Sequence, residues 1–126
     1  NGGDIAQSLL SDGCIVQGAR LKDCMLGIRS IVGADADLEE VVMMGGDFYE
    51  SQDSIEQSEV QGCPRIGIGS GTTVRHAIID KNARIGKNCR ITPDGKPQDM
   101  DHELYHMRDG IVIIPKNAIV PDNTVI

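Results

Sequence analysis

The sequence predicts an all-β fold, a parallel β-helix built from hexapeptide repeats and interrupted by two irregular insertions. Three observations indicate it. Aliphatic residues recur every six positions, and a small residue stands four places after most of them. Glycine and asparagine lie in between, where tight corners need unusual backbone angles. The 126 residues include one phenylalanine, two tyrosines and no tryptophan, so the core must be thin and aliphatic.

The repeat occurs in four places along the chain. It is clearest at 79–91 and 114–126, and it also occurs at 10–16 and 68–74. A period of six fits neither the 3.6-residue helix nor the alternation of a single strand. It fits a triangular coil with one short strand on each side and about 18 residues per turn. Because such coils stack continuously, we expect residues 1–126 to form one domain.

This geometry predicts which side chains point into the coil. The aliphatic residue at the start of each hexad faces inward, and the small residue four places later packs where two walls converge. The predicted inward aliphatic residues are Leu10, Val16, Ile68, Val74, Ile79, Ile85, Ile91, Ile114, Val120 and Ile126. The predicted small residues are Cys14, Thr72, Ala83, Cys89, Ala118 and Thr124.

Two stretches break the period and are predicted to be insertions. The first, about residues 45–65, is acidic, and Ser51–Gln61 within it is a candidate short helix. The second, about residues 92–109, is polar and contains two prolines, so we expect a surface excursion. Long loops in a compact solenoid tend to be functional.

Charge is segregated along the sequence, although the net charge is −7. Residues 35–60 hold nine acidic and no basic residues, whereas residues 65–90 hold six of the twelve lysines and arginines. On a β-helix these cations could form a patch that binds a small phosphorylated ligand. The alternative is a solvated face with scattered counter-ions. The acidic balance and the lack of aromatic residues argue against nucleic-acid binding.

The cysteines predict no metal site or disulfide framework, and the hydropathy pattern predicts no membrane-spanning or signal segment. Cys14, Cys24, Cys63 and Cys89 form no CxxC pair, so we expect no zinc site, and reduced thiols rather than a disulfide framework. No run of about 18 apolar residues predicts a membrane span. The first residues have neither a basic region nor an apolar run, so we expect no signal peptide in this chain.

Three segments make the chain resemble the C-terminal domain of glucose-1-phosphate adenylyltransferase (ADP-glucose pyrophosphorylase). They are MGGDFYES at 44–51, IIDKNARIG at 78–86 and GIVIIPKNAIVPDNTVI at 110–126. The first two are similar to the cyanobacterial and plastid branch of that family. The resemblance implies a left-handed coil, against the usual right-handed crossover of parallel strands. It also implies a bacterial cytoplasmic or a plastid location.

The resemblance implies that the parent enzyme joins ATP and glucose 1-phosphate to give ADP-glucose and pyrophosphate, with Mg²⁺. Its nucleotidyltransferase domain is absent from this chain, so we expect no catalytic residue and no cofactor here. The run IGIGSG at 66–71 is similar to a phosphate loop in composition. It falls on repeat corners, however, and is interpreted as structural.

In this family the C-terminal domain serves assembly and allosteric control. The resemblance implies that Lys81 and Lys116 bind the activator 3-phosphoglycerate, with phosphate as inhibitor. Both occupy the third, outward place of a hexad, and lysine offers a mobile charge for phosphate. Arg84 and Arg75 are added by proximity. The implied partners are the enzyme's own catalytic domain and sister subunits of a tetramer.

Two other functions are compatible with a hexapeptide β-helix. One is an acyltransferase, with His76 as the base at a subunit interface. The other is a non-catalytic scaffold whose exposed strand edges bind a partner. A zinc site would need His76, His102 and His106 to converge. We expect these three to be surface histidines, and no metal site.

Overall fold

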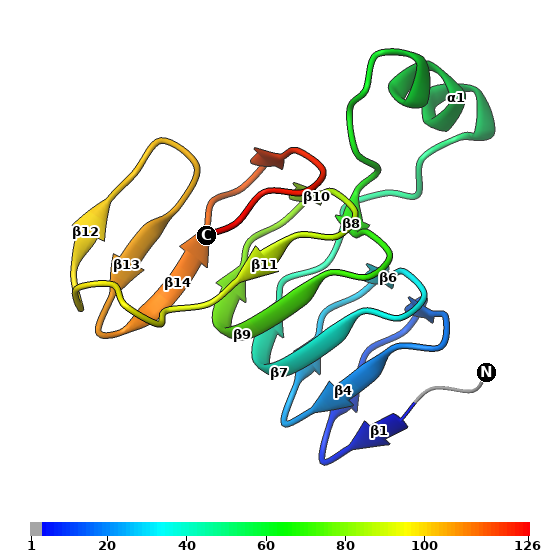
Figure 1. Cartoon of the computed structure of the whole chain (residues 1–126). Helices are drawn as coiled ribbons and strands as arrows, with labels where there is room; N and C mark the ends of the chain where they lie inside the picture. The colour runs from blue at the N-terminus through cyan, green and yellow to red at the C-terminus, as the bar shows by residue number, and fades with distance from the viewer. Residues whose placement is uncertain (1–3) are drawn as a thin grey trace.

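A computed structural model describes residues 4–126 as a stack of short strands that wind from the N-terminal to the C-terminal end (Figure 1). The strands before the first insertion are β1 (Asp4–Ala6), β2 (Leu9–Leu10), β3 (Ile15–Val16), β4 (Arg20–Lys22), β5 (Met25–Leu26), β6 (Ile31–Val32) and β7 (Asp37–Met43). Those after it are β8 (Gly67–Ile68), β9 (Thr73–Ile79), β10 (Arg84–Ile85), β11 (Arg90–Ile91), β12 (Met100–Asp101), β13 (His106–Arg108), β14 (Ile111–Ile114) and β15 (Ile119–Val120).

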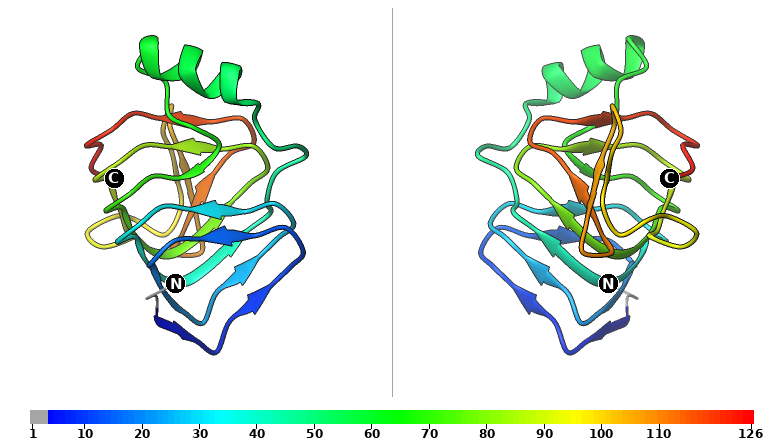
Figure 2. Two further views of the ribbon diagram at one scale, coloured as in Figure 1. Left: turned by 90° about the vertical axis from the view of Figure 1, so that its right-hand side faces the viewer. Right: turned by 90° about the vertical axis from the view of Figure 1, so that its left-hand side faces the viewer.

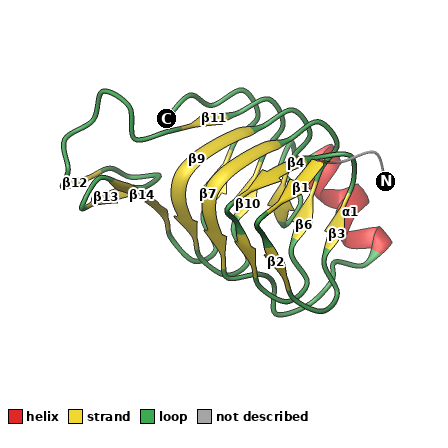
Figure 3. Cartoon of the chain, turned by 90° about the horizontal axis from the view of Figure 1, so that it is seen from below, coloured by secondary structure: helices red, strands yellow, loops and turns green. Residues whose placement is uncertain are grey.

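The strands form three walls of parallel pairs, as the period of six predicts. The first wall contains β1, β4, the first half of β7, the first half of β9, and β11. The second contains β2, β5, the second halves of β7 and β9, and β14. The third contains β3, β6, β8, β10 and β15. Figure 2 looks along this stack from either end, and Figure 3 shows the coils side by side.

The inward positions build one aliphatic core. Eight of the ten predicted aliphatic residues are buried: Ile68, Val74, Ile79, Ile85, Ile91, Ile114, Val120 and Ile126. Leu10 is instead 43% exposed, and Val16 is only partly buried. Both belong to the N-terminal end of the stack, where no preceding coil of the described chain covers them. Each coil buries its inner face only against its neighbours.

The corners require left-handed backbone angles, as the glycine and asparagine pattern predicts. Asn82, Asn88, Asn117 and Asn123 have φ between 57° and 63°. Asparagine tolerates this region better than most residues, because its short side chain bonds locally. β7 and β9 each turn from the first wall to the second through such a residue, Glu40 at φ 55° and His76 at φ 50°.

The first insertion carries the one helix of the described residues, α1 (Gln52–Val60), within one residue of the predicted span at each end. The Ser51 side chain caps it by accepting a hydrogen bond from the Ser54 N–H. The helix stands off from the coils, with only Ile55 buried (Figure 2). Within residues 4–126 no helix has the length and apolar character needed to cross a membrane.

The second insertion, residues 92–109, is mostly exposed, as expected of a surface excursion, but part of it is regular. β12 and β13 form an antiparallel hairpin, and β13 pairs with β14, so the hairpin extends the second wall at its C-terminal edge (Figure 1). Met107 is fully buried and Tyr105 is 7% exposed. The insertion therefore covers an edge of β14 that would otherwise present unpaired N–H and C=O groups.

Candidate functional site

Lys81 and Lys116 lie one above the other on adjacent coils, at the corner between the second and third walls. Backbone hydrogen bonds hold the register: the Asp80 N–H donates to the Ile114 carbonyl at 2.9 Å, and the Asn117 N–H donates to the Lys81 carbonyl at 3.0 Å. Neighbouring strands of a sheet are about 4.8 Å apart. The two lysine side chains therefore start from backbone positions about one strand spacing apart. We call residues 44–47, 80–82 and 115–117 the lysine corner.

The asparagines after the two lysines shape this corner. Asn82 has φ 59° and Asn117 has φ 61°, so the chain turns sharply directly after each lysine. Both lysine side chains are exposed as a result. The spacing of 35 residues between the lysines equals the register of the adjoining strands, in which Arg84 pairs with Ile119.

A carboxylate that the sequence did not single out shares the corner. Asp47, on the preceding coil, places its Oδ1 3.3 Å from the Lys81 Nζ. Asn82 donates from Nδ2 to the Asp47 Oδ2 at 3.1 Å and accepts the Asp47 N–H at 2.9 Å. The hydrogen bond from Asn82, followed by that from Lys81, holds the pKa of the Asp47 carboxyl below its usual value. The charge of Lys116 lowers that pKa further.

The Arg84 side chain binds to the first insertion and does not extend into solvent. Its Nη1 lies 3.0 Å from the Glu50 Oε2 and donates to the Pro64 carbonyl at 2.9 Å. The Glu50 side chain is only 5% exposed, and its other oxygen accepts the Ile66 N–H at 2.7 Å. Arg84 thus ties together the two ends of the insertion that carries α1. A ligand would have to compete with a buried carboxylate for this guanidinium.

Arg75 lies on the first wall, away from the lysine corner. Its Nη2 is 3.1 Å from the Asp37 Oδ2, and its Nε is 3.5 Å from the Glu39 Oε2. Register pairs Arg75 with Glu39 and continues to Lys22 on β4, so this face is a ladder of alternating charges. The structure therefore brings Lys81 and Lys116 together and leaves Arg75 in a separate ion-pair network.

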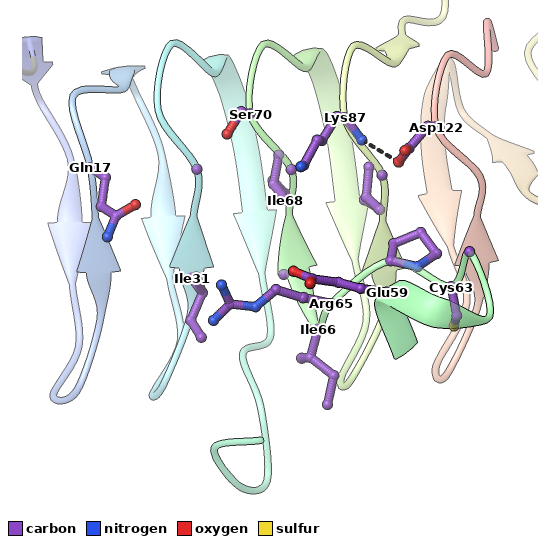
Figure 4. A pocket seen from close by; sticks show the side chains of 17 residues that line it. Gln17, Ile31, Glu59, Cys63, Arg65, Ile66, Ile68, Ser70, Lys87 and Asp122 are labelled. Atoms are coloured by element: carbon purple, nitrogen blue, oxygen red, sulfur yellow. Dashed lines mark hydrogen bonds between the residues drawn. The ribbon is translucent and has the colours of Figure 1, made fainter. Parts of the chain in front are cut away.

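The third wall carries a groove of about 450 Å³, which the sequence did not indicate. It lies beneath the insertion, and its lining includes Gly67 and Gly69. Figure 4 shows Arg65, Ser70 and Lys87 around it. The glycines are there for packing. A Cβ on Gly69 would lie 2.5 Å from the Gly86 carbonyl carbon of the next coil. The backbone N–H groups of Gly67 and Gly69 also donate to neighbouring coils, so this run offers no free phosphate nest there.

The cysteines and histidines lie apart from one another. All four thiols are free, and burial raises the pKa of the Cys24 thiol. His76 Nδ1 lies 2.9 Å from the Glu40 Oε2 at an exposed corner. In the second insertion, His102 stacks on Tyr105, and His106 contacts Asp101. Within residues 4–126 no group of three or more His, Cys, Asp or Glu residues is placed to hold a metal ion.

Comparison with known proteins agrees with this architecture. The family model of the GLGC left-handed parallel β-helix domain matches residues 1–125, which confirms the predicted fold and its left hand. The chain is 40% identical over 121 residues to the glucose-1-phosphate adenylyltransferase large subunit 1, chloroplastic/amyloplastic, of Zea mays. That match covers 94% of this chain and 23% of the maize protein, so the chain spans less than a quarter of that relative. The chain belongs to the family of left-handed β-helix domains of glucose-1-phosphate adenylyltransferases.

Proposed function

We propose that this chain is the regulatory and assembly domain of a glucose-1-phosphate adenylyltransferase, and that Lys81 and Lys116 bind the anionic groups of a phosphorylated effector. The observation that carries the proposal is the position of these two exposed lysines on adjacent coils of one corner. Two ammonium groups so placed match a phosphate or a phosphorylated acid, such as 3-phosphoglycerate, because each oxygen can accept a charge-assisted hydrogen bond. Arg84 and Arg75 are weaker candidates, since both already bind carboxylates of the same chain.

The catalytic reaction belongs to the rest of the longer protein. It joins ATP and glucose 1-phosphate to form ADP-glucose and pyrophosphate, the step that supplies glycogen or starch synthesis. Mg²⁺ would act there, beside the phosphates. The maize relative is a plastid protein by name, so a plastid location is proposed beside the bacterial cytoplasm. The His76–Glu40 pair of the acyltransferase alternative lies at the corner between the first and second walls, apart from the lysine corner.

The lysines can be tested in the full-length enzyme. Lys81→Ala and Lys116→Ala should each raise the 3-phosphoglycerate concentration for half-maximal activation about ten-fold or more, since a charged hydrogen bond contributes roughly 1.5–3 kcal/mol. Lys22→Ala is the matched control: this lysine also pairs with a carboxylate, Glu39 at 3.8 Å, but on the first wall. Unchanged activation in both corner variants would refute the assignment.

An apolar row on the second wall supports the assembly function. Register aligns Leu9, Met25, Val42, Ile78 and Ile113 across five coils, and all five point outward. Leu9 is 67% and Met25 is 53% exposed. A contiguous apolar row on a surface marks an interaction site. The row ends beside the lysine corner, so the catalytic domain or a sister subunit packed on it would also border the effector site.

Charged substitutions in this row should weaken assembly. Met25→Glu or Val42→Glu in the full-length protein should raise the subunit dissociation constant, or that of the separated catalytic domain, at least about ten-fold by burying an unpaired charge. Analytical ultracentrifugation measures it. Thr73→Glu, outward on the first wall, is the control and should change little. If Thr73→Glu raised the dissociation constant as much as Met25→Glu or Val42→Glu, the second wall would not be a specific docking face.

A further inference from the structure

Asp47 is the carboxylate that forms an ion pair with Lys81 at the proposed effector site. It begins the first insertion, directly after the glycines at 45–46, and its carboxylate is turned toward the next coil. Asn82 holds both its backbone N–H and its side chain, while Lys81 lies 3.3 Å away. The two hydrogen bonds with Asn82 thus orient the Asp47 carboxylate toward Lys81.

We propose that Asp47 is an internal counter-ion of the effector site, which neutralises Lys81 until a phosphorylated ligand displaces it. The inference rests on the proposed function of Lys81 and Lys116. Asp47 would then regulate the affinity of the corner for anions, because an effector has to compete with this carboxylate for Lys81. Carboxylate and phosphate oxygens are both strong acceptors for an ammonium group.

The competition is electrostatic. An ammonium group has three donors, so Lys81 does not lack hydrogen atoms for a second anion. A phosphate bound to Lys81 would, however, lie close to the negative charge of Asp47, and the two like charges would repel each other. Asp47 and Lys81 side chains are 47% and 45% exposed, so an anion from solvent can reach the pair, and the carboxylate can rotate away. The neighbouring charge of Lys116 strengthens the attraction of either anion to the corner.

The release of Asp47 would remain local. Glu50, three residues later, is held separately by Arg84 and by the Ile66 N–H. The insertion would therefore keep its second anchor when Asp47 leaves Lys81. Binding of an effector would loosen only the start of the insertion, which is the segment that leads from the lysine corner to α1.

The test uses the 126-residue chain and inorganic phosphate as the ligand, followed by NMR shifts of the backbone amides of Lys81, Asn82 and Lys116. Asp47→Asn removes the charge while its amide oxygen still accepts from Asn82. It should tighten phosphate binding about two- to five-fold, the equivalent of one exposed ion pair. Asp35→Asn is the matched control: it makes the same change at an exposed corner residue with φ 61°. It should alter binding less than Asp47→Asn does.

The outcomes separate this inference from the proposed function. If Lys81→Ala abolishes the phosphate shifts but Asp47→Asn leaves the affinity unchanged or weaker, the counter-ion assignment is wrong and the effector site stands. Equal tightening by Asp35→Asn would also overturn it, because the effect would then be one of net charge. If phosphate shifts no amide at the corner in any variant, both proposals fail. Amide dispersion in each spectrum verifies that the variant is folded.

Discussion

Substitution of Gly69 by alanine should destabilise the β-helix by about 3 kcal/mol or more, the upper part of the range for overpacking. A Cβ at this position would lie 2.5 Å from both the carbonyl carbon and the oxygen of Gly86, and 2.7 Å from the Lys87 nitrogen. All three atoms belong to the backbone of the next coil. No rotation of a side chain can relieve such contacts, so the two coils would have to separate and lose the hydrogen bond from Gly69 to Ile85.

Denaturant unfolding followed by circular dichroism measures this effect. Gly62→Ala is the control, because a Cβ there meets nothing within 4 Å. Its φ of +73° still disfavours alanine, so we expect a cost of about 1 kcal/mol. A Gly69→Ala variant as stable as the control would show that coil spacing does not require this glycine. It would also reopen the interpretation of the IGIGSG run as structural.

Substitution of Arg84 by alanine should have the second largest effect, a loss of about 3 kcal/mol in the stability of the first insertion. The change removes the ion pair with Glu50 and leaves that carboxylate, 5% exposed, with the Ile66 N–H as its remaining partner. It also removes the hydrogen bond to the Pro64 carbonyl. A buried charge without its counter-ion is costly, so the ends of the insertion should open.

Hydrogen exchange of the α1 amides and denaturant unfolding together detect this opening. Adding Glu50→Gln to the Arg84→Ala variant should recover part of the loss, because a neutral amide replaces the stranded charge. Arg90→Ala is the control: the Arg90 side chain is exposed and has no ion pair within residues 4–126. The explanation is refuted if the double variant is no more stable than Arg84→Ala alone.

The charge pattern shows why the basic segment could not be interpreted from the sequence alone. Residues 35–60 and 65–90 are separate along the chain, yet the register pairs Leu38 with Val74 on adjacent strands. Acidic residues of the first segment therefore meet basic residues of the second. Lys81, Arg84 and Arg75 all contact carboxylates that way. Both predicted arrangements are partly present: counter-ions are scattered, and two lysines still share a corner.

The sequence by itself determined the repeat, the aliphatic core, the left-handed asparagine corners and the helix of the first insertion. Each of these depends on residues within about six positions of one another, so the local pattern carries the information. The family resemblance added the hand of the coil and the two lysines.

Only the tertiary structure decided which side chains meet across coils. The offset from Asp47 to Lys81 depends on the length of the first insertion, and the pairing of β13 with β14 depends on the free edge that β14 presents. The segment at 44–51 resembles the family in sequence, but that resemblance does not reveal that Asp47 contacts Lys81. The repeat predicts two outward cations at the lysine corner, but in the structure the corner also holds the carboxylates of Asp47 and Asp80, and Asp47 forms an ion pair with Lys81. Charge interactions act through space over distances that the sequence spacing does not reveal.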